Sequence, residues 1–255
     1  MITADKIKEL REISGISLMA CRKALEETGG DLEKALEIIK KASADVAARK
    51  AERTAKDGAI LIKKSGPQTA VVILNCETDF VAKNENFIKL ANDLADIALK
   101  EGADKAKAGA RQLIEAVIQK TGENIQLKDI VIVSGNTGAY VHGGKIGAVV
   151  SLNKDNDGLA RDLAMHITAL KPEYLSFQDI PKDKWQEMTS YYKEEVSKMN
   201  KPEAIKDKIV EGKLNEYFKQ FTLLEQPFIK DDKSSIKDLL KKENNSVNFF
   251  QLYAL

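Results

Sequence analysis

Residues 75–87 read NCETDFVAKNENF and join an apolar, β-branched run to an amphipathic helical pattern. Before this segment, residues 59–62 and 69–75 predict the two strands of a hairpin, with a four-residue loop at 65–68. After it, apolar side chains recur at helical spacing, namely Phe87, Leu90, Ala91, Leu94 and Ala98. A strand therefore ends and a helix begins within this short, mostly polar stretch.

Two interpretations of the stretch remain open. Thr78 and Asp79 are typical of a helix-capping turn, and Phe80 and Val81 stand among polar residues. In the first interpretation Phe80 packs back onto the following helix as a hydrophobic staple. In the second it stays exposed beside a carboxylate, as binding anchors do. The physics of the segment alone favours the staple.

The first forty residues predict three short helices. Thr3, Ser17 and Asp31 are suitable N-caps, and glycines at 15 and 29–30 end the first two helices. Three short helices bury little apolar area and form a marginal core. Such a core suits an interaction module better than a catalytic domain. Residues 40–56 are rich in Ala, Lys and Arg, and they predict a solvated helix or a linker at a domain boundary.

The remaining pattern indicates an α+β protein with a helical arm. Residues 130–133, 139–141 and 146–152 predict strands, with turns at 135–138 and 143–144, and a helix follows from Asp157. Two longer amphipathic helices, broken at residues 200–202, predict an antiparallel coiled-coil arm. A short helix at 236–240 and an apolar end at 247–255 complete the chain.

Composition narrows the class of protein. Apolar residues make up 43% of the 255 residues, charged residues make up 31%, and the net charge is +1. We therefore expect no nucleic-acid or membrane partner. Cys21 and Cys76 lie far apart and predict neither a disulfide nor a zinc site, which favours a reducing cytoplasm. No apolar run is long enough to span a membrane, and the first residues do not resemble a targeting segment.

No motif for catalysis is evident. Neither His142 nor His166 has a partner at metal-ligand spacing, so we expect no metal, no cofactor and no enzyme activity. The run at 142–147, HGGKIG, superficially resembles a phosphate loop, but it lies between predicted strands. A turn whose glycines adopt positive φ explains it better.

The stretch TDFVAKNENF at 78–87 closely resembles the characteristic motif of the elongation factor Ts family. Further similarities follow in the family's order: the capped helices of residues 8–31, AERTAKDG at 51–58, YVHGGKIG at 140–147, the stretch from Met165 and His166 to Leu175, and LEQPF at 224–228.

The resemblance implies a domain organisation. Residues 1–41 would form a ubiquitin-associated-like helical module, followed by a linker at 42–57. Two similar α+β halves would form the core, at 58–135 and at 136–180 with 219–233. The coiled-coil arm would span 181–218, and a short C-terminal module would span 234–255.

The resemblance also implies a function. Family members promote GDP release from elongation factor Tu and bind it in its GDP-bound and nucleotide-free forms. A turn, here Asp79, Phe80, Val81 and Ala82, would enter the GTPase domain and disturb Mg²⁺ and phosphate binding. The other implied contacts are Leu10, Leu18 and Met19 in the helical module, the loop His142, Gly143 and Gly144, and Met165 with His166, for which helix packing is an equal alternative.

Two questions stay open at this level. The first forty residues alone would also suit a ubiquitin-associated-type adaptor that binds other proteins. The arm would serve either to pair two copies as a homodimer or to contact the partner.

Overall fold

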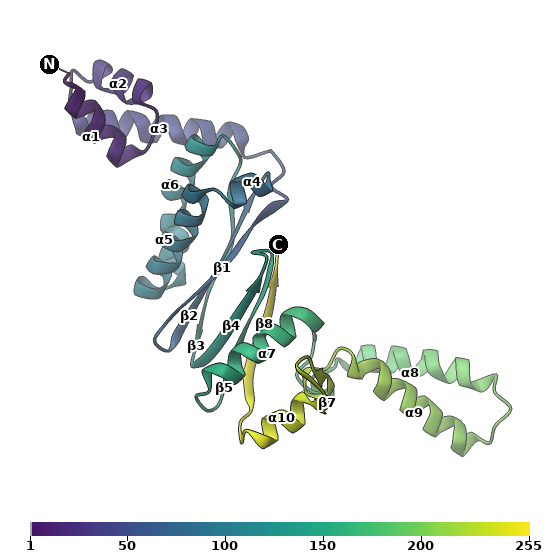
Figure 1. The fold of residues 1–255 in the computed structure, drawn as a ribbon. Coiled ribbons are helices and arrows are strands. Elements are labelled where there is room, and N and C mark those ends of the chain that lie inside the picture. Colours follow the sequence, from purple (N-terminus) through teal and green to yellow (C-terminus); the bar gives the residue numbers. More distant parts are fainter. Residues whose placement is uncertain (1) are drawn as a thin grey trace. The chain divides into compact units, whose positions relative to one another are not determined.

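The computed structural model describes residues 2–255, which form two compact units (Figure 1). The first unit runs to Ser134 and also includes Val141–Gly147 and Tyr253–Leu255. The second comprises Gly135–Tyr140 and Ala148–Leu252. Helices and small antiparallel sheets make both units, as the α+β expectation requires.

Three capped helices open the first unit: α1 (Ala4–Ser14), α2 (Leu18–Glu27) and α3 (Leu32–Lys50). The predicted caps are confirmed, because the side chains of Thr3, Ser17 and Asp31 each accept a backbone N–H of the first turn. Gly15 ends α1 in the left-handed conformation, at φ 66°. The three helices close over a small core that includes Leu10, Cys21, Leu25, Ala35 and Ile39.

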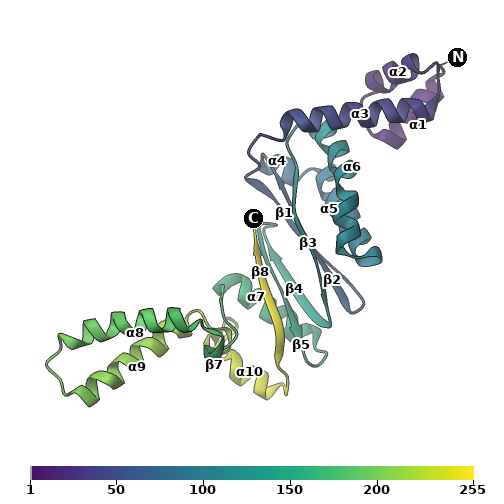
Figure 2. The same cartoon turned by 180° about the vertical axis from the view of Figure 1, so that it is seen from behind.

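Helix α3 continues through much of the stretch expected to be a solvated helix or linker. Its second half packs against α6 (Ala103–Thr121), as the view in Figure 2 shows. Val46 and Ala47 contact the core of the unit, and the buried Ser43 hydroxyl hydrogen-bonds Gln119. Residues 42–50 thus belong to a packed helix, and the irregular connection is limited to residues 51–56.

The first sheet has the order β1-β2-β3, with all strands antiparallel: β1 (Asp57–Ser65), β2 (Gln68–Cys76) and β3 (Gln126–Ser134). The predicted four-residue hairpin loop is wrong. Ser65 pairs with Gln68, so only Gly66 and Pro67 form the loop, with Gly66 at φ 55°. Helices α5 (Glu85–Glu101) and α6 pack on the sheet and bury Phe87 and Leu94 completely.

The second sheet has the order β4-β5-β8: β4 (Asn136–His142), β5 (Ile146–Leu152) and β8 (Val247–Ala254). The predicted turn at 135–138 is wrong, because only Gly135 interrupts the chain between β3 and β4. Gly138 lies inside β4, against the backbone of α7 (Asp157–Leu170). Its lack of a side chain serves close packing rather than a turn.

The remaining elements of the second unit are short, apart from one helix pair. β6 (Pro227–Phe228) pairs with β7 (Asp231–Ser235), and α10 (Ile236–Lys242) follows. Helices α8 (Lys182–Ser197) and α9 (Glu203–Lys219) pack against each other along the predicted apolar faces, with Trp185 stacked on Phe218 at 4.8 Å between ring centroids. Within residues 2–255, no helix combines the length and the apolar character that crossing a bilayer demands.

Gly138→Ala should destabilise the second unit. A Cβ at this position would lie 2.4 Å from the carbonyl carbon of Ala160, so the backbone of β4 or α7 must move. Overpacking of this kind costs about 1–3 kcal/mol. Gly212→Ala is the matched control, since nothing lies within 4 Å of a Cβ in the middle of α9; it should stabilise by up to about 1 kcal/mol. Urea unfolding measures both, and an unchanged midpoint for Gly138→Ala would contradict the packing described.

Candidate functional site

The segment between β2 and α5 forms a single helical turn, α4 (Asp79–Ala82). Thr78 is its N-cap, with an extended backbone and a hydroxyl oxygen that accepts the Val81 N–H at 3.4 Å. Asn84 then caps α5, since its side chain accepts the Asn86 N–H at 2.9 Å. The capping role expected of Thr78 is confirmed. We call residues 78–82 the 78–82 turn.

The turn separates its two large apolar side chains. Val81 is only 9% exposed and packs into the core of the first unit, with Ala82 beside it. Phe80 is 83% exposed. The staple interpretation is therefore wrong: successive residues of a helical turn point about 100° apart, and Val81 takes the inward position. The structure presents Phe80 to solvent at the tip of a fixed turn.

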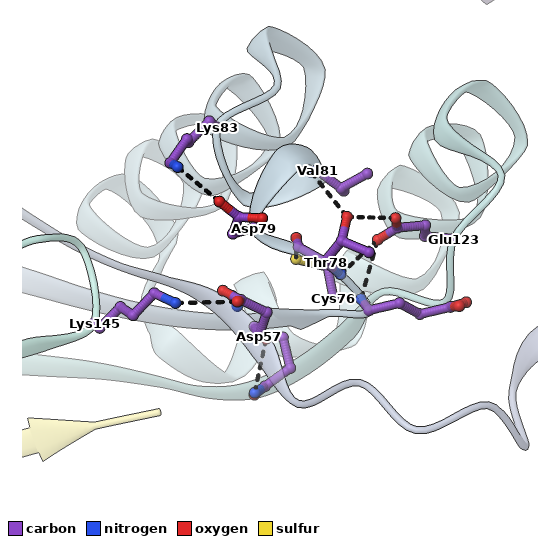
Figure 3. A network of polar contacts seen from close by, with 11 residues as sticks. Asp57, Cys76, Thr78, Asp79, Val81, Lys83, Glu123 and Lys145 are labelled. Atoms are coloured by element: carbon purple, nitrogen blue, oxygen red, sulfur yellow. Dashed lines mark hydrogen bonds and ion pairs between the residues drawn. The ribbon is translucent and has the colours of Figure 1, made fainter.

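Two ionised carboxylates lie on the same side of the turn (Figure 3). The Asp79 carboxylate accepts a hydrogen bond from the Lys83 ammonium at 2.8 Å, which holds the pKa of Asp79 below its usual range. The Gly58 N–H and the Lys145 ammonium lower the pKa of Asp57 in the same way, with the Gly58 hydrogen bond the larger cause. Both groups therefore carry negative charge at neutral pH.

The loop of residues 142–145 is tied to the strand beside this turn. Gly143 and Gly144 have φ of 57° and 73°, and the Lys145 N–H donates to the His142 carbonyl at 3.1 Å. The interpretation as a strand turn that needs positive φ is confirmed. The Gly144 carbonyl accepts the Ile60 N–H at 2.7 Å, and Lys145 reaches Asp57 at 3.0 Å. The loop with His142 and the start of β1 thus form one surface of the first unit.

The expected contacts in the helical module divide into buried and exposed residues. Leu10 is fully buried in the module core, so its side chain packs between the helices and is not at the surface. Leu18 and Met19 are 48% and 74% exposed. Ile13, at 59%, adds an exposed apolar side chain that sequence reasoning missed. One turn after Leu10 the inward position belongs to Ser14, whose hydroxyl donates to the Leu10 carbonyl at 2.6 Å, and Ile13 is left outside.

His166 is fully buried in the second unit and has no surface to offer a partner, whereas Met165 is partly buried. The Nδ1 atom of His166 accepts a hydrogen bond from the Ile229 N–H at 3.3 Å. The Nε2 atom therefore carries the proton and donates to Gln226 Oε1 at 2.9 Å. Burial lowers the pKa of His166 and keeps the ring neutral. The alternative of a packed helix histidine is the one that this geometry supports.

The groups of the site suit recognition rather than bond-making chemistry. Burial raises the pKa of the Cys76 thiol to about 12, which makes it a poor nucleophile. Residues 2–255 hold no cluster of three or more His, Cys, Asp or Glu side chains placed to bind a metal ion. An exposed aromatic ring, two charged pairs and a glycine loop remain, all on the first unit.

Comparison with known proteins identifies related chains along the whole length. The family model described as "Elongation factor TS" matches residues 77–255. Elongation factor Ts of Hydrogenobaculum sp. is 38% identical over 265 residues, which cover 98% of this chain and 97% of the relative. The Hahella chejuensis protein of the same name is 40% identical over 254 residues, which cover 96% of this chain and 89% of the relative. Elongation factor Ts of Thermobifida fusca is 40% identical over 266 residues, which cover 97% of this chain and 96% of the relative.

His166 should make stability depend on pH. The unfolded chain protonates this histidine below about pH 6.5, whereas the native state resists protonation because its pKa is lowered. The unfolded state then binds more protons, so the free energy of unfolding falls as the pH drops through this range.

The test compares wild type with His166→Gln by urea unfolding between about pH 7.5 and about 5.5. The stability advantage of wild type should shrink towards acid pH. His142→Gln, at an exposed position, is measured in parallel as the control for replacing a histidine. A pH-independent difference between wild type and His166→Gln would contradict the neutral, buried ring.

Proposed function

The chain belongs to the elongation factor Ts family, and we propose that it releases GDP from elongation factor Tu by inserting the 78–82 turn into the GTPase domain. Members of this family are non-catalytic nucleotide exchange factors in translation elongation, and the chain is therefore not an enzyme. The insertion of the turn and the roles of its residues are our proposal. In this role the chain acts in the cytoplasm.

The observation that carries the proposal is the exposure of Phe80 on a turn that is anchored on both sides. Phe80 is 83% exposed and contributes little to the hydrophobic core, whereas its neighbour Val81 is buried. The cap at Thr78 and the start of α5 fix the backbone before and after it. Because the turn is ordered in the free protein, binding costs little conformational entropy. Aromatic anchors of this kind dominate interface energies.

The mechanism that we propose is displacement, without a covalent step. Mg²⁺ holds nucleotide phosphates in a demanding octahedral geometry, so a small shift of its surroundings weakens GDP binding strongly. Phe80 would act as the wedge that causes this shift, with Asp79 as its charged neighbour. Exchange factor and nucleotide must then weaken each other's binding by the same free energy, so that incoming nucleotide releases the factor.

Further contacts follow from the same arrangement. We propose that the loop with His142, Gly143 and Gly144 meets the partner beside the 78–82 turn, because the Lys145–Asp57 pair ties the loop to the start of β1 (Figure 3), and α4 packs against β1. Leu18 and Met19, together with Ile13, would form the contact of the helical module. We also propose the family's division of the chain: a ubiquitin-associated-like module, two core halves, a coiled-coil arm and a C-terminal module.

Phe80→Ala should slow GDP release from the cognate elongation factor Tu by about 30-fold relative to wild type, as expected for a binding hot spot. Stopped-flow fluorescence with a labelled GDP measures the rate. Phe249→Ala, which removes another exposed aromatic ring outside the arm and the 78–82 turn, is the control and should keep the wild-type rate. If Phe80→Ala is as fast as wild type, the wedge lies elsewhere. If wild type itself does not accelerate release, the adaptor interpretation replaces the exchange function.

The Mg²⁺ part of the mechanism has a separate test. With EDTA present, GDP already leaves quickly, so the advantage of wild type over Phe80→Ala should shrink several-fold compared with about 5 mM Mg²⁺. A ratio that is the same with and without Mg²⁺ would contradict displacement of the metal and would leave the phosphate contacts as the target of Phe80.

A further inference from the structure

Two backbone N–H groups at the end of β2 have an unusual acceptor. The pairing of β2 with its neighbours ends at Cys76, so the N–H groups of Glu77 and Thr78 have no strand partner. Both donate to Oε2 of Glu123, at 3.1 and 3.0 Å. Glu123 follows Gly122, which ends α6 in the left-handed conformation at φ 77°. A carboxylate is a strong acceptor for two adjacent donors.

The same carboxylate orients the cap of the turn. Glu123 Oε1 accepts a hydrogen bond from the Thr78 hydroxyl, with 2.6 Å between the two oxygens. A hydroxyl has only one proton, so the Thr78 oxygen then offers its lone pairs to the Val81 N–H, at 3.4 Å. Glu123 thus sets the rotamer and the polarity of the cap that starts α4, one residue before Asp79 (Figure 3). Phe80 is the next residue of the chain.

The residues after β2 and after α6 bind each other in both directions, and both also bind the chain that follows α3. Glu77 Oε1 accepts the Asn124 N–H at 2.7 Å and lies 3.7 Å from the Arg53 guanidinium. The buried Asn124 amide donates to the Arg53 carbonyl at 2.6 Å. Two adjacent residues after α6 therefore hold two adjacent residues after β2, and the chain that leaves α3 is bound to both.

We propose that Glu123 is a positioning residue for nucleotide exchange, which acts on the partner only through Phe80. Its carboxylate holds the backbone at the start of the 78–82 turn, and with it the position from which the exposed ring projects. Without Glu123, the N–H groups of Glu77 and Thr78 would turn to water, and the turn that carries the ring would sample several positions. The productive fraction, and with it the exchange rate, would fall. This inference rests on the proposed wedge function of Phe80.

A double-mutant cycle tests the dependence on Phe80. Glu123→Ala should slow stopped-flow GDP release by about tenfold, the equivalent of one charge-assisted hydrogen bond. Glu123→Gln should show a smaller loss, since its amide keeps one acceptor for the N–H groups but turns a donor towards Thr78. In the Phe80→Ala background, neither change should slow release further. Glu101→Ala, an exposed carboxylate paired with Lys105 at 3.9 Å, should match wild type.

Amide hydrogen exchange of the free protein supplies a readout that does not need the partner. In Glu123→Ala the amides of Glu77, Thr78 and Val81 should lose protection, while those of the central strand β2 should keep it. If Glu123→Ala does not fold, Thr78→Val, which removes the hydroxyl at constant shape, should free the Val81 amide and slow release through Phe80 in the same way.

Three results would overturn the proposal. The first is an unchanged exchange rate in Glu123→Ala. The second is an equal loss in the presence and absence of Phe80, which would show an effect on stability or on another surface. The third is unchanged protection of the three amides. If Phe80→Ala alone releases GDP as fast as wild type, the wedge function fails, and amide protection then decides alone whether Glu123 positions the turn.

Discussion

Burial of Val81, in the turn that follows the central strand β2, is the constraint on which the exposed surface of the first unit depends. The strand ends at Cys76, and a single helical turn must begin at once so that α5 can bury Phe87 on the same sheet. With Thr78 as the cap, Val81 faces the core and Phe80 faces solvent. The apolar contact that stabilises the fold therefore also turns Phe80, the residue proposed to act on the partner, towards solvent.

Anchoring of this turn relies on backbone contacts more than on its surface charges. The Asp79–Lys83 pair is exposed, and such pairs contribute about 0–1 kcal/mol. The hydrogen bonds to Glu123 instead satisfy backbone donors that the sheet leaves unpaired. The Cys76 thiol adds a donor to the Thr78 carbonyl at 3.2 Å, and burial keeps that thiol protonated. The proposed insertion would benefit from a tip that is already formed, because a mobile aromatic would lose binding free energy in becoming ordered.

Local signals in the sequence predicted the helix caps and the apolar faces of α8 and α9, because a cap or a helical stripe depends on neighbours within four residues. Local signals could not predict features that depend on residues far apart in the sequence. Cross-strand pairing of Ser65 with Gln68 shortens the first hairpin loop, and close approach of α7 explains Gly138. Whether Phe80 or Val81 turns inward depends on where the turn starts relative to β2. Glu123 lies 45 residues from Thr78, and no local pattern links them.

Photocrosslinking from position 80 tests the central claim most directly. A benzophenone amino acid in place of Phe80 would be irradiated with the nucleotide-free partner, and the same group in place of the exposed Tyr191 would serve for comparison. The account predicts a crosslink from position 80 to the GTPase domain of elongation factor Tu, beside its Mg²⁺ and phosphate site, that is lost when excess GDP and Mg²⁺ are added. Crosslinks from position 80 to another domain, or none while the complex forms, would contradict it.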